Sequence, residues 1–330
     1  MKIILAPMEG VVDHQMRTFL TEIGGYDRCV TEFIRVTDRL LPRRVFRRIC
    51  PELDSKGKTP SGIPVTIQLL GGIAEIVAIN AQRAVEMGAQ GIDINFGCPS
   101  KFVTRKAGGA VLLKEPQRIQ QIVTAVRQVV PDTIPFSAKI RLGYDDTELA
   151  LENAAAVQGG GADYIVVHGR TKKEGYRPPA DWQWIARIRQ SLDIPVVANG
   201  DINSLEDYQH CVEISGCESV MIGRGALSQP GLACNIQQHL SGSDTSEFPW
   251  TKVETLIAVM LRDAMARKVL DRHNVSRLKQ WLVYLKRHYP EAEKLFCQIR
   301  TLNDPLQVIS LLSNTISSGE SAFFSVESAN

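Results

Sequence analysis

Short apolar runs alternate with longer amphipathic stretches over the first 240 residues, and this alternation constrains the fold more than any other feature. Eight runs have the length and composition of β-strands. They are "KIILAPM" (2–8), "CVTEF" (29–33), "VTIQLL" (65–70), "GIDINF" (91–96), "FSAKIRL" (136–142), "YIVVHGR" (164–170), "IPVVANGDI" (194–202) and "SVMIGRG" (219–225). Strands this apolar are typical of a parallel sheet that helices cover on both faces. Eight of them predict an α/β fold of the (β/α)8 barrel type.

The segments between these runs repeat as amphipathic helices do. Ile73, Val77, Ala81 and Val85 recur every four residues and so share one helix face. Residues 115–131 and 205–216 have the same pattern and end on proline or glycine. An open doubly wound sheet stays an alternative, but no Gly-x-Gly-x-x-Gly follows the first run, so a dinucleotide-binding sheet has no direct support.

The strand pattern stops near residue 240, so the barrel is predicted to occupy residues 1–240. Residues 241–250 begin with "SGSDTSEFP", a polar break that predicts a linker. Residues 251–312 carry only helical patterns, one of which places Val275, Leu278 and Leu282 on one face. They predict a small all-helical C-terminal domain. Residues 313–330 contain six serines and predict a disordered tail.

The N-terminal residues and the cysteines indicate the compartment. Only four apolar residues separate Lys2 from Pro7, too few for the core of a signal peptide. No run of about 18 apolar residues occurs that would span a membrane. The seven cysteines are scattered, without a Cys-x-x-Cys pair that would indicate zinc or a disulfide framework. We therefore expect a cytoplasmic protein without a metal ion or a membrane contact, and we expect it to act as a monomer.

The net charge of +2 hides an uneven distribution. Residues 35–48 hold six arginines against one aspartate, and residues 262–300 hold ten basic against four acidic side chains. These local charges of +5 and +6, subtracted from the total, leave −9 for the rest of the chain. Either basic stretch alone is most simply a solvated face. Together, on an acidic body, they indicate a polyanionic partner such as nucleic acid.

Polar side chains stand at the ends of the predicted strands, where the reactive groups of a (β/α)8 barrel gather. Lys139 is the most informative, since a cation within "FSAKIRL" needs a partner, a ligand or access to solvent. His168 by itself is more often a satisfied core histidine. Asn199-Gly200-Asp201 and Gly223-Arg224 lie at the ends of the last two runs, at the usual phosphate site of such barrels. They predict a phosphorylated ligand. Because Gln68, Lys139 and His168 are available to hydrogen-bond an extended ring system, flavin mononucleotide (FMN) at the barrel mouth fits better than a bare sugar phosphate.

Cys98 lies in "DINFGCPSK" (93–101), between glycine and proline, where the fourth run ends. Four roles are open to it: metal ligand, nucleophile, acid or packing residue. Metal binding lacks companion ligands, and packing is disfavoured on a turn among strand-end polar groups. A thiol with a pKa of about 8.5 is mostly protonated at neutral pH and donates a proton without special tuning. Lys101, Arg105 and Lys106 follow closely and would instead favour the thiolate, the nucleophilic form.

Motifs along the whole barrel resemble, in the same order, those of the tRNA-dihydrouridine synthase family. They are "LAPMEGV", "TEF", "VTIQLLG", "DINFGCPSK", "GGAVLLKEP", "AKIRLGYDD", "VVHGRTKKEGY", "PVVANGDI" and "VMIGRGAL". Asn-x-Gly-Cys-Pro and His-Gly-Arg-Thr are the most specific elements. "TEFIRVTDRLLPRRVF" and "RLKQWLVYLK" further resemble the bacterial C-type subgroup, which modifies uridine 16 of tRNA.

This resemblance implies an FMN-binding barrel with a helical domain that reduces the C5=C6 bond of a tRNA uridine with NADPH. It implies FMN contacts from Pro7, Met8, Glu9, Gln68, Lys139, His168, Asn199, Gly200, Asp201, Gly223 and Arg224. Cys98 corresponds to the family's proton donor, and Asn95 to a residue near the target base. Because flavin N5 supplies a hydride to C6, an acid is needed for C5, and this favours the acid role of Cys98 over the nucleophilic one.

A uridine in a folded RNA has to leave its stack to reach a flavin, so phosphate contacts are expected around the site. The residues that we expect to face RNA are Arg35, Tyr176, Arg272, Arg277 and Lys279, although Tyr176 is equally well explained as an ordinary loop aromatic. One alternative is an FMN barrel that acts on a free pyrimidine-like metabolite with Cys98 as base, which leaves the basic helical domain unexplained. Another is an RNA-binding protein without turnover, and the intact strand-end residues argue against it.

Overall fold

The computed structural model describes residues 3–100, 108–266 and 271–316. The chain divides into two compact units, Met1–Ser246 and Glu247–Asn330. The division falls inside the stretch 241–250 that the sequence predicts as a linker. Each unit has buried apolar side chains of its own.

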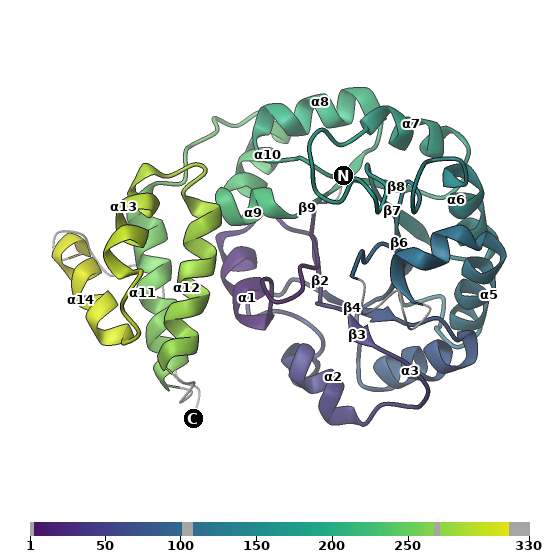
Figure 1. Ribbon diagram of the computed structural model, residues 1–330, viewed down its shortest axis with the longest axis horizontal. Helices are drawn as coiled ribbons and strands as arrows, with labels where there is room; N and C mark the ends of the chain where they lie inside the picture. Colours follow the sequence, from purple (N-terminus) through teal and green to yellow (C-terminus); the bar gives the residue numbers. More distant parts are fainter. Residues whose placement is uncertain (1–2, 101–107, 267–270, 317–330) are drawn as a thin grey trace. The chain divides into compact units, whose positions relative to one another are not determined.

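The first unit is a closed barrel of parallel strands (Figure 1). Its strands are β1 (Ile3–Leu5), β2 (Arg28–Val30), β3 (Ile34–Arg35), β4 (Val65–Leu70), β5 (Ile92–Asn95), β6 (Phe136–Arg141), β7 (Tyr164–His168), β8 (Val196–Asn199) and β9 (Ser219–Ile222). β2 and β3 both pair with β4 and form one interrupted barrel strand. The ring closes at β1, which pairs with β2 and with β9. The predicted (β/α)8 barrel is therefore confirmed.

Helices surround the ring of strands (Figure 1). They are α1 (His14–Ile23), α2 (Arg43–Ile49), α3 (Ala74–Glu86), α5 (Pro116–Arg127), α6 (Ala150–Gly159), α7 (Trp182–Gln190), α8 (Leu205–Ser215), α9 (Arg224–Ser228) and α10 (Leu232–Leu240), with 3-10 helices η1 (Pro51–Ser55) and η2 (Gly109–Lys114). The side chains of Asp13, Asp181 and Ser204 accept backbone N–H groups and set where α1, α7 and α8 begin. In α3, Val77 and Ala81 are buried as predicted, whereas Ile73 precedes the helix and is 46% exposed.

The interior of the barrel is filled by side chains from most of its strands. One buried cluster consists of Ile4, Ala6, Val30, Val166, Val197 and Met221, and the partly buried Tyr164 packs against it. Burying a large apolar side chain stabilises a fold by about 1.5–3 kcal/mol. This packed interior holds the strands in register and so sets the positions of the residues at their carboxyl ends.

The second unit is helical, as the sequence predicts. Its helices are α11 (Trp250–Ala266), α12 (Asp271–Leu285), α13 (Pro290–Ile299) and α14 (Pro305–Ile316). Ile257, Leu278, Leu282 and Ile299 are fully buried among them. None of the helices that the structure describes is long and apolar enough to cross a membrane.

The end of α14 corrects the predicted start of the C-terminal tail. The helix continues to Ile316, whereas the serine content of residues 313–330 predicts disorder from residue 313 onward. Val308 and Leu312 lie four residues apart and are both buried, so this segment has an apolar helix face that packs against the unit. Residues 317–330 of the predicted tail lie outside the described residues.

Candidate active site

The carboxyl ends of β5 to β9 bring predicted site residues to one rim of the barrel. The register places Asn95 beside Lys139, Arg141 beside His168, and His168 beside Asn199. Asn199 pairs in turn with Met221 of β9. Residues far apart in the sequence share this rim because all the strands run in the same direction.

Lys139 extends along this rim to Asn199. Its Nζ donates a 2.8 Å hydrogen bond to Asn199 Oδ1, and Asn199 Nδ2 donates one of 2.8 Å to the carbonyl oxygen of Met221. Burial of the amine and the nearby charge of Arg141 lower the pKa of Lys139 to about 7, although Asp93 opposes this shift. The amine is therefore divided between charged and neutral forms at neutral pH, and an anionic ligand would favour the charged form.

His168 is a neutral hydrogen-bond donor at this rim. Its Nε2 lies 3.2 Å from Nη1 of Arg170, and a guanidinium group only donates, so Nε2 is the acceptor. Burial, followed by the charges of Arg141 and Lys139, lowers the pKa of His168 well below its ordinary value. The imidazole is therefore neutral at pH 7 and carries its hydrogen on Nδ1.

Asp201 organises the arginines at the predicted phosphate site. Its Oδ2 accepts from Arg170 and, at 2.7 Å, from the backbone N–H of Ala180, while its Oδ1 accepts from Arg224 at 3.2 Å. The Arg170 side chain is 1% exposed, but that of Arg224 is 29% exposed. Arg224 is thus held by a carboxylate and still presents part of its guanidinium group to a ligand.

The two predicted phosphate-site glycines have different surroundings. Gly200 has a φ of +124°, and a Cβ there would lie 2.8 Å from Cβ of Ala180. At Gly223 the nearest atoms to an added Cβ would be Cβ of Ala6 and Sδ of Met8, both at 3.7 Å. The fold therefore requires glycine at position 200, whereas position 223 has room for a side chain.

The loop that carries Cys98 is held from both sides. The backbone N–H groups of Gly97 and Cys98 each donate a 2.9 Å hydrogen bond to Asn95 Oδ1. Arg141 Nε donates to the Gly97 carbonyl at 2.8 Å, and its Nη1 donates to the carbonyls of Thr171 and Gly175 at 3.1 and 2.8 Å. Arg141 is the second cation at the end of "FSAKIRL", a strand-end position where a polar side chain needs a partner or a ligand, but the sequence assigns it no specific role.

The half-buried Cys98 thiol has a raised pKa. Burial is the main cause, and the negative charge of Glu9 adds to it, while a backbone hydrogen bond and the cations Arg141 and Arg35 act in the other direction. The protonated thiol, which is the form that donates a proton, is therefore the dominant form at neutral pH. The cations expected to favour the thiolate, Lys101, Arg105 and Lys106, lie outside the described residues.

The segment after β1 places Glu9 near Arg35. Pro7 and Met8 are partly buried, and Glu9 is exposed. Although the residue as a whole is exposed, partial desolvation of its carboxylate and the nearby charge of Glu32 raise the pKa of Glu9, while Arg35 lowers it. Arg35, at the end of β3, also acts on the pKa of Cys98. The predicted RNA-facing Arg35 and the predicted flavin-facing Glu9 thus lie close to the thiol.

Tyr176 lies over the cations of the rim. Its ring centroid is 5.1 Å from the Arg141 guanidinium carbon, 5.6 Å from that of Arg224 and 6.1 Å from the His168 ring. The side chain is nevertheless 57% exposed. An exposed aromatic ring supported by cations at a barrel mouth is suited to stacking against a base.

Gln68 lies at the centre of a buried polar layer, and its amide is bonded on both sides. Nε2 donates to Asp93 Oδ2 at 2.7 Å, and Oε1 accepts from Asn95 Nδ2 at 2.8 Å. The second carboxylate oxygen of Asp93 accepts from Ser137 Oγ at 2.6 Å. Burial raises the pKa of Asp93 to about 6, against the hydrogen bonds from Ser137 and Gln68. Asp93 and Ser137 were not predicted, although a carboxylate inside "GIDINF" was a signal for the layer.

The other predicted RNA-facing residues belong to α12 in the helical unit. Arg277 and Lys279 are partly buried, and Lys279 Nζ donates to the carbonyl of Leu302 at 2.7 Å. This bond joins α12 to the segment that precedes α14. The side chain of Arg272 lies outside the described part of the structure.

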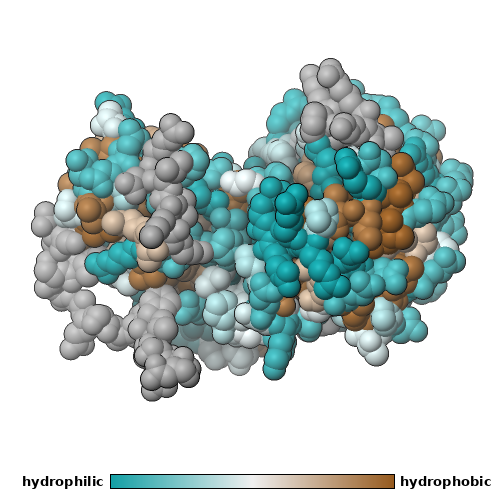
Figure 2. All heavy atoms as spheres, turned by 90° about the horizontal axis from the view of Figure 1, so that it is seen from below, coloured by the Kyte–Doolittle hydropathy of each residue, from teal (hydrophilic) through white to brown (hydrophobic). Residues whose placement is uncertain are grey.

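The arginine-rich stretch forms the exposed surface of α2, on Arg43, Arg44, Arg47 and Arg48. Arg47 pairs with Asp54 at 2.9 Å, and Arg43 lies 3.8 Å from Glu86. Figure 2, which views the molecule from below Figure 1, shows hydrophilic residues beside a hydrophobic patch on the barrel unit. The exposed arginines of α2 are compatible with the predicted polyanionic partner.

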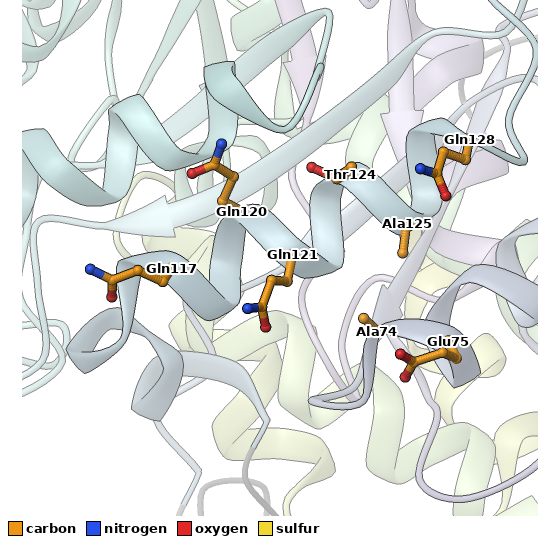
Figure 3. Close-up of a pocket in the computed structure, with 8 residues that line it drawn as sticks. All are labelled: Ala74, Glu75, Gln117, Gln120, Gln121, Thr124, Ala125 and Gln128. Atoms are coloured by element: carbon orange, nitrogen blue, oxygen red, sulfur yellow. The ribbon is translucent and has the colours of Figure 1, made fainter.

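A groove between α3 and α5 lies outside the ring of strands (Figure 3). It is lined mainly by amide side chains of α5, and its residues are Ala74, Glu75, Gln117, Gln120, Gln121, Thr124, Ala125 and Gln128. None of the predicted site residues borders it.

Comparison with known proteins identifies the family. The dihydrouridine synthase family model matches residues 4–316. The tRNA-dihydrouridine(16) synthase of Shewanella oneidensis is 48% identical over 315 residues, which cover 94% of this chain and 97% of that protein. The proteins of the same name from Pseudomonas putida and Escherichia coli K12 are 47% and 49% identical, over 94% and 92% of this chain and 96% and 95% of their own lengths. The chain therefore belongs to the dihydrouridine synthase family.

Proposed function

We propose that this protein reduces uridine 16 of tRNA to 5,6-dihydrouridine, with NADPH as reductant and FMN as cofactor. Similarity over almost the whole length to proteins named for this reaction supports the substrate. The observation that carries the mechanism is the position of Cys98, on a loop held at the rim that also bears Lys139, His168 and Arg224. Burial there raises the pKa of its thiol. We further infer that the protein acts as a monomer in the cytoplasm.

The donors at the rim fit FMN by their chemistry. Arg224, with the backbone around Gly200 and Gly223, would hold the phosphate, because a partly exposed cation and N–H groups are suited to an anion. Lys139 would supply a cation, and His168 Nδ1–H a neutral donor, to the flavin ring and its side chain. Gln68, Asn199, Asp201 and the segment Pro7-Met8-Glu9 would complete the site. FMN, when bound, supplies the hydride that C6 of the uracil ring receives.

Cys98 supplies the proton that this hydride makes necessary. The C5=C6 double bond of the uracil ring is lost as C6 gains the hydride and C5 gains the proton of the thiol. Burial and Glu9 keep that thiol protonated in the resting enzyme. Water then restores the proton of the thiolate before the next turnover. Asn95, which holds the Cys98 backbone, lies close to where the target base would enter.

Contacts to RNA come from basic and aromatic side chains in both units. A uridine in the D-loop has to be swung out of its stack to reach the rim, and an exposed Tyr176 is available to stack against an RNA base. Arg35 lies near Cys98, where a phosphate next to the flipped base would pass. The arginines of α2, together with Arg272, Arg277 and Lys279 of α12, would bind other phosphates of the RNA backbone.

The test uses the full chain as purified. We expect a yellow protein with a flavin spectrum that forms dihydrouridine at position 16 in unmodified tRNA when NADPH is supplied, and a Cys98→Ala variant that retains its flavin but loses this activity. A preparation that stays colourless after incubation with FMN would rule out the cofactor. Reduction of free uridine or orotate in preference to tRNA would favour the metabolite-reducing alternative. Mapping the modified nucleotide decides the position.

A further inference from the structure

We propose that Asp93 is a positioning residue for Cys98. Its carboxylate begins a hydrogen-bond chain that runs through Gln68 and Asn95 to the backbone of the loop that carries Cys98. The inference rests on the proposed role of Cys98 as proton donor. It assigns a function to a buried carboxylate that touches neither the rim nor the thiol. It also explains why the apolar strand β5 carries an aspartate at all.

The hydrogen-bond chain from Asp93 to the loop is continuous and shielded from water. Gln68 and Asp93 are direct partners in the register of β4 and β5, and both are at most 1% exposed. The bonds run from Gln68 Nε2 to Asp93 (2.7 Å), from Asn95 Nδ2 to Gln68 Oε1 (2.8 Å), and from the N–H groups of Gly97 and Cys98 to Asn95 Oδ1 (2.9 Å each). Asn95 is 9% exposed. Water therefore has little access with which to replace any of these bonds.

Asp93 at one end of the hydrogen-bond chain and the loop N–H groups at the other favour the same orientation of the Gln68 and Asn95 amides. An ionised carboxylate only accepts hydrogen bonds, so Gln68 has to turn its NH2 group toward Asp93. Its oxygen then faces Asn95, which has to present its own NH2 group and so directs its oxygen to the loop. At the loop, two backbone N–H groups require an acceptor. Each hydrogen bond of this series joins a donor to an acceptor only in this one arrangement of the two amides.

Without the carboxylate acceptor, only the two loop N–H groups still orient the amides, and the NH2 group of Gln68 is left buried without its acceptor. Gln68 would then have to shift or turn to regain a partner, and its oxygen would no longer be held in place for Asn95. A buried donor without an acceptor disfavours a conformation by roughly 10- to 100-fold. The loop would therefore leave the position in which Asn95 holds it, and the Cys98 thiol would move with it.

Ser137 provides a matched control on the same carboxylate. It is the direct partner of Asp93 in the register of β5 and β6, and its hydroxyl donates to Oδ1, whereas Gln68 bonds to Oδ2. Ser137→Ala removes a hydrogen bond of similar burial from Asp93 but leaves the chain intact. Asp93→Asn keeps an oxygen for Gln68 and can place its NH2 group toward the Ser137 oxygen. Asp93→Val removes the acceptor, and Gln68→Met breaks the chain at its middle.

Two readouts that do not depend on turnover test the chain. The first is hydrogen exchange of the peptide that contains Gly97 and Cys98, whose amides should exchange about tenfold faster in Asp93→Val and Gln68→Met. The second is the rate at which iodoacetamide modifies Cys98, resolved by peptide mass spectrometry. We expect this rate to change at least about threefold in both variants, with the exposed Cys297 as internal reference. Ser137→Ala and Asp93→Asn should resemble the wild type in both measurements.

A double-mutant comparison separates positioning from general destabilisation. In an Asn95→Ala background the chain is already broken, so adding Asp93→Val should not accelerate the exchange of Gly97 and Cys98 further. Additive acceleration, or unchanged exchange and alkylation in both Asp93→Val and Gln68→Met, would overturn the proposal. If Asp93→Val does not fold, the amide exchange and alkylation of Gln68→Met alone test the proposal. In the tRNA assay, kcat should fall about tenfold in these variants with little change in KM for tRNA. Absence of dihydrouridine in the wild type would refute the proposed function but leave the exchange results valid.

Discussion

The amine of Lys139 donates a 2.8 Å hydrogen bond to the side-chain oxygen of Asn199 across the strand that separates them in the barrel. Because the pKa of this amine is lowered to about 7, the bond joins a neutral acceptor to a lysine that is readily deprotonated. A negatively charged ligand at this rim would therefore raise the pKa of Lys139 and stabilise its charged form.

Replacing Lys139 with methionine should weaken FMN binding about tenfold at pH 6.5, because a charge-assisted hydrogen bond is lost. The difference between wild type and variant should shrink as the pH rises through about 7, since the cation that favours an anion is present only below its pKa. Flavin fluorescence titrations at several pH values measure this. The control is Lys114→Met, an exposed lysine bonded to Asp145. If the FMN affinities of the wild type and Lys139→Met differ by the same factor at every pH, Lys139 does not change its charge over this range.

Replacing Glu9 with glutamine should lower the pKa of the Cys98 thiol, because the negative charge of Glu9 disfavours the thiolate. Alkylation of Cys98 at pH 8 should become about two- to threefold faster, an effect sized for a partly screened charge. The pH profile of the alkylation rate, resolved for Cys98, measures this. Glu22→Gln, a carboxylate of α1, serves as the control. An unchanged profile would exclude Glu9 as a cause of the raised pKa.

Asp93→Asn should change the pH dependence of stability. The folded-state pKa of Asp93, about 6, lies above the ordinary aspartate value, so the wild type takes up a proton on folding and loses stability as the pH rises from 4 to 6. Asparagine does not ionise, so the variant does not lose stability in this way. Its free energy of unfolding, relative to that of the wild type, should therefore rise by on the order of 2 kcal/mol between pH 4 and 6. Urea denaturation at pH 4.5 and 7 measures it.

Asp145→Asn is the control for this measurement. The exposed Asp145 carboxylate has a pKa that Lys114 lowers, so its contribution to stability is present at neutral pH and is lost as the pH falls. The relative stability of this variant should therefore change in the opposite direction. Equal pH dependence in the wild type and Asp93→Asn would show that Asp93 titrates normally.

Gly200→Ala should destabilise the barrel by about 2 kcal/mol, because a side chain there meets Ala180 and the backbone has a positive φ. Gly223→Ala should change stability by less than about 0.5 kcal/mol, since the added Cβ meets only ordinary contacts. Thermal unfolding compares the two. Equal losses would mean that the site glycines have the same structural role.

The barrel and most of its strand-end residues can be predicted from the amino-acid sequence alone. Apolar runs and amphipathic repeats are local patterns, and eight parallel strands bring their carboxyl ends to one rim whatever the details of packing. Lys139, His168 and Asn199 therefore meet where the sequence predicts them. The end of α14 was harder to predict, because residues 313–316 of this helix belong to the serine-rich stretch 313–330.

The protonation of Cys98 and the buried polar layer beneath the rim depend on contacts that form only in the folded barrel. The charges that act on the thiol come from Glu9, Arg35 and Arg141, which lie on three different strand ends. The amide of Gln68 is oriented by Asp93 and Asn95, which follow it by more than twenty residues. Electrostatic interactions and hydrogen bonds depend on distance through space rather than along the chain, so these properties exist only once the barrel has closed.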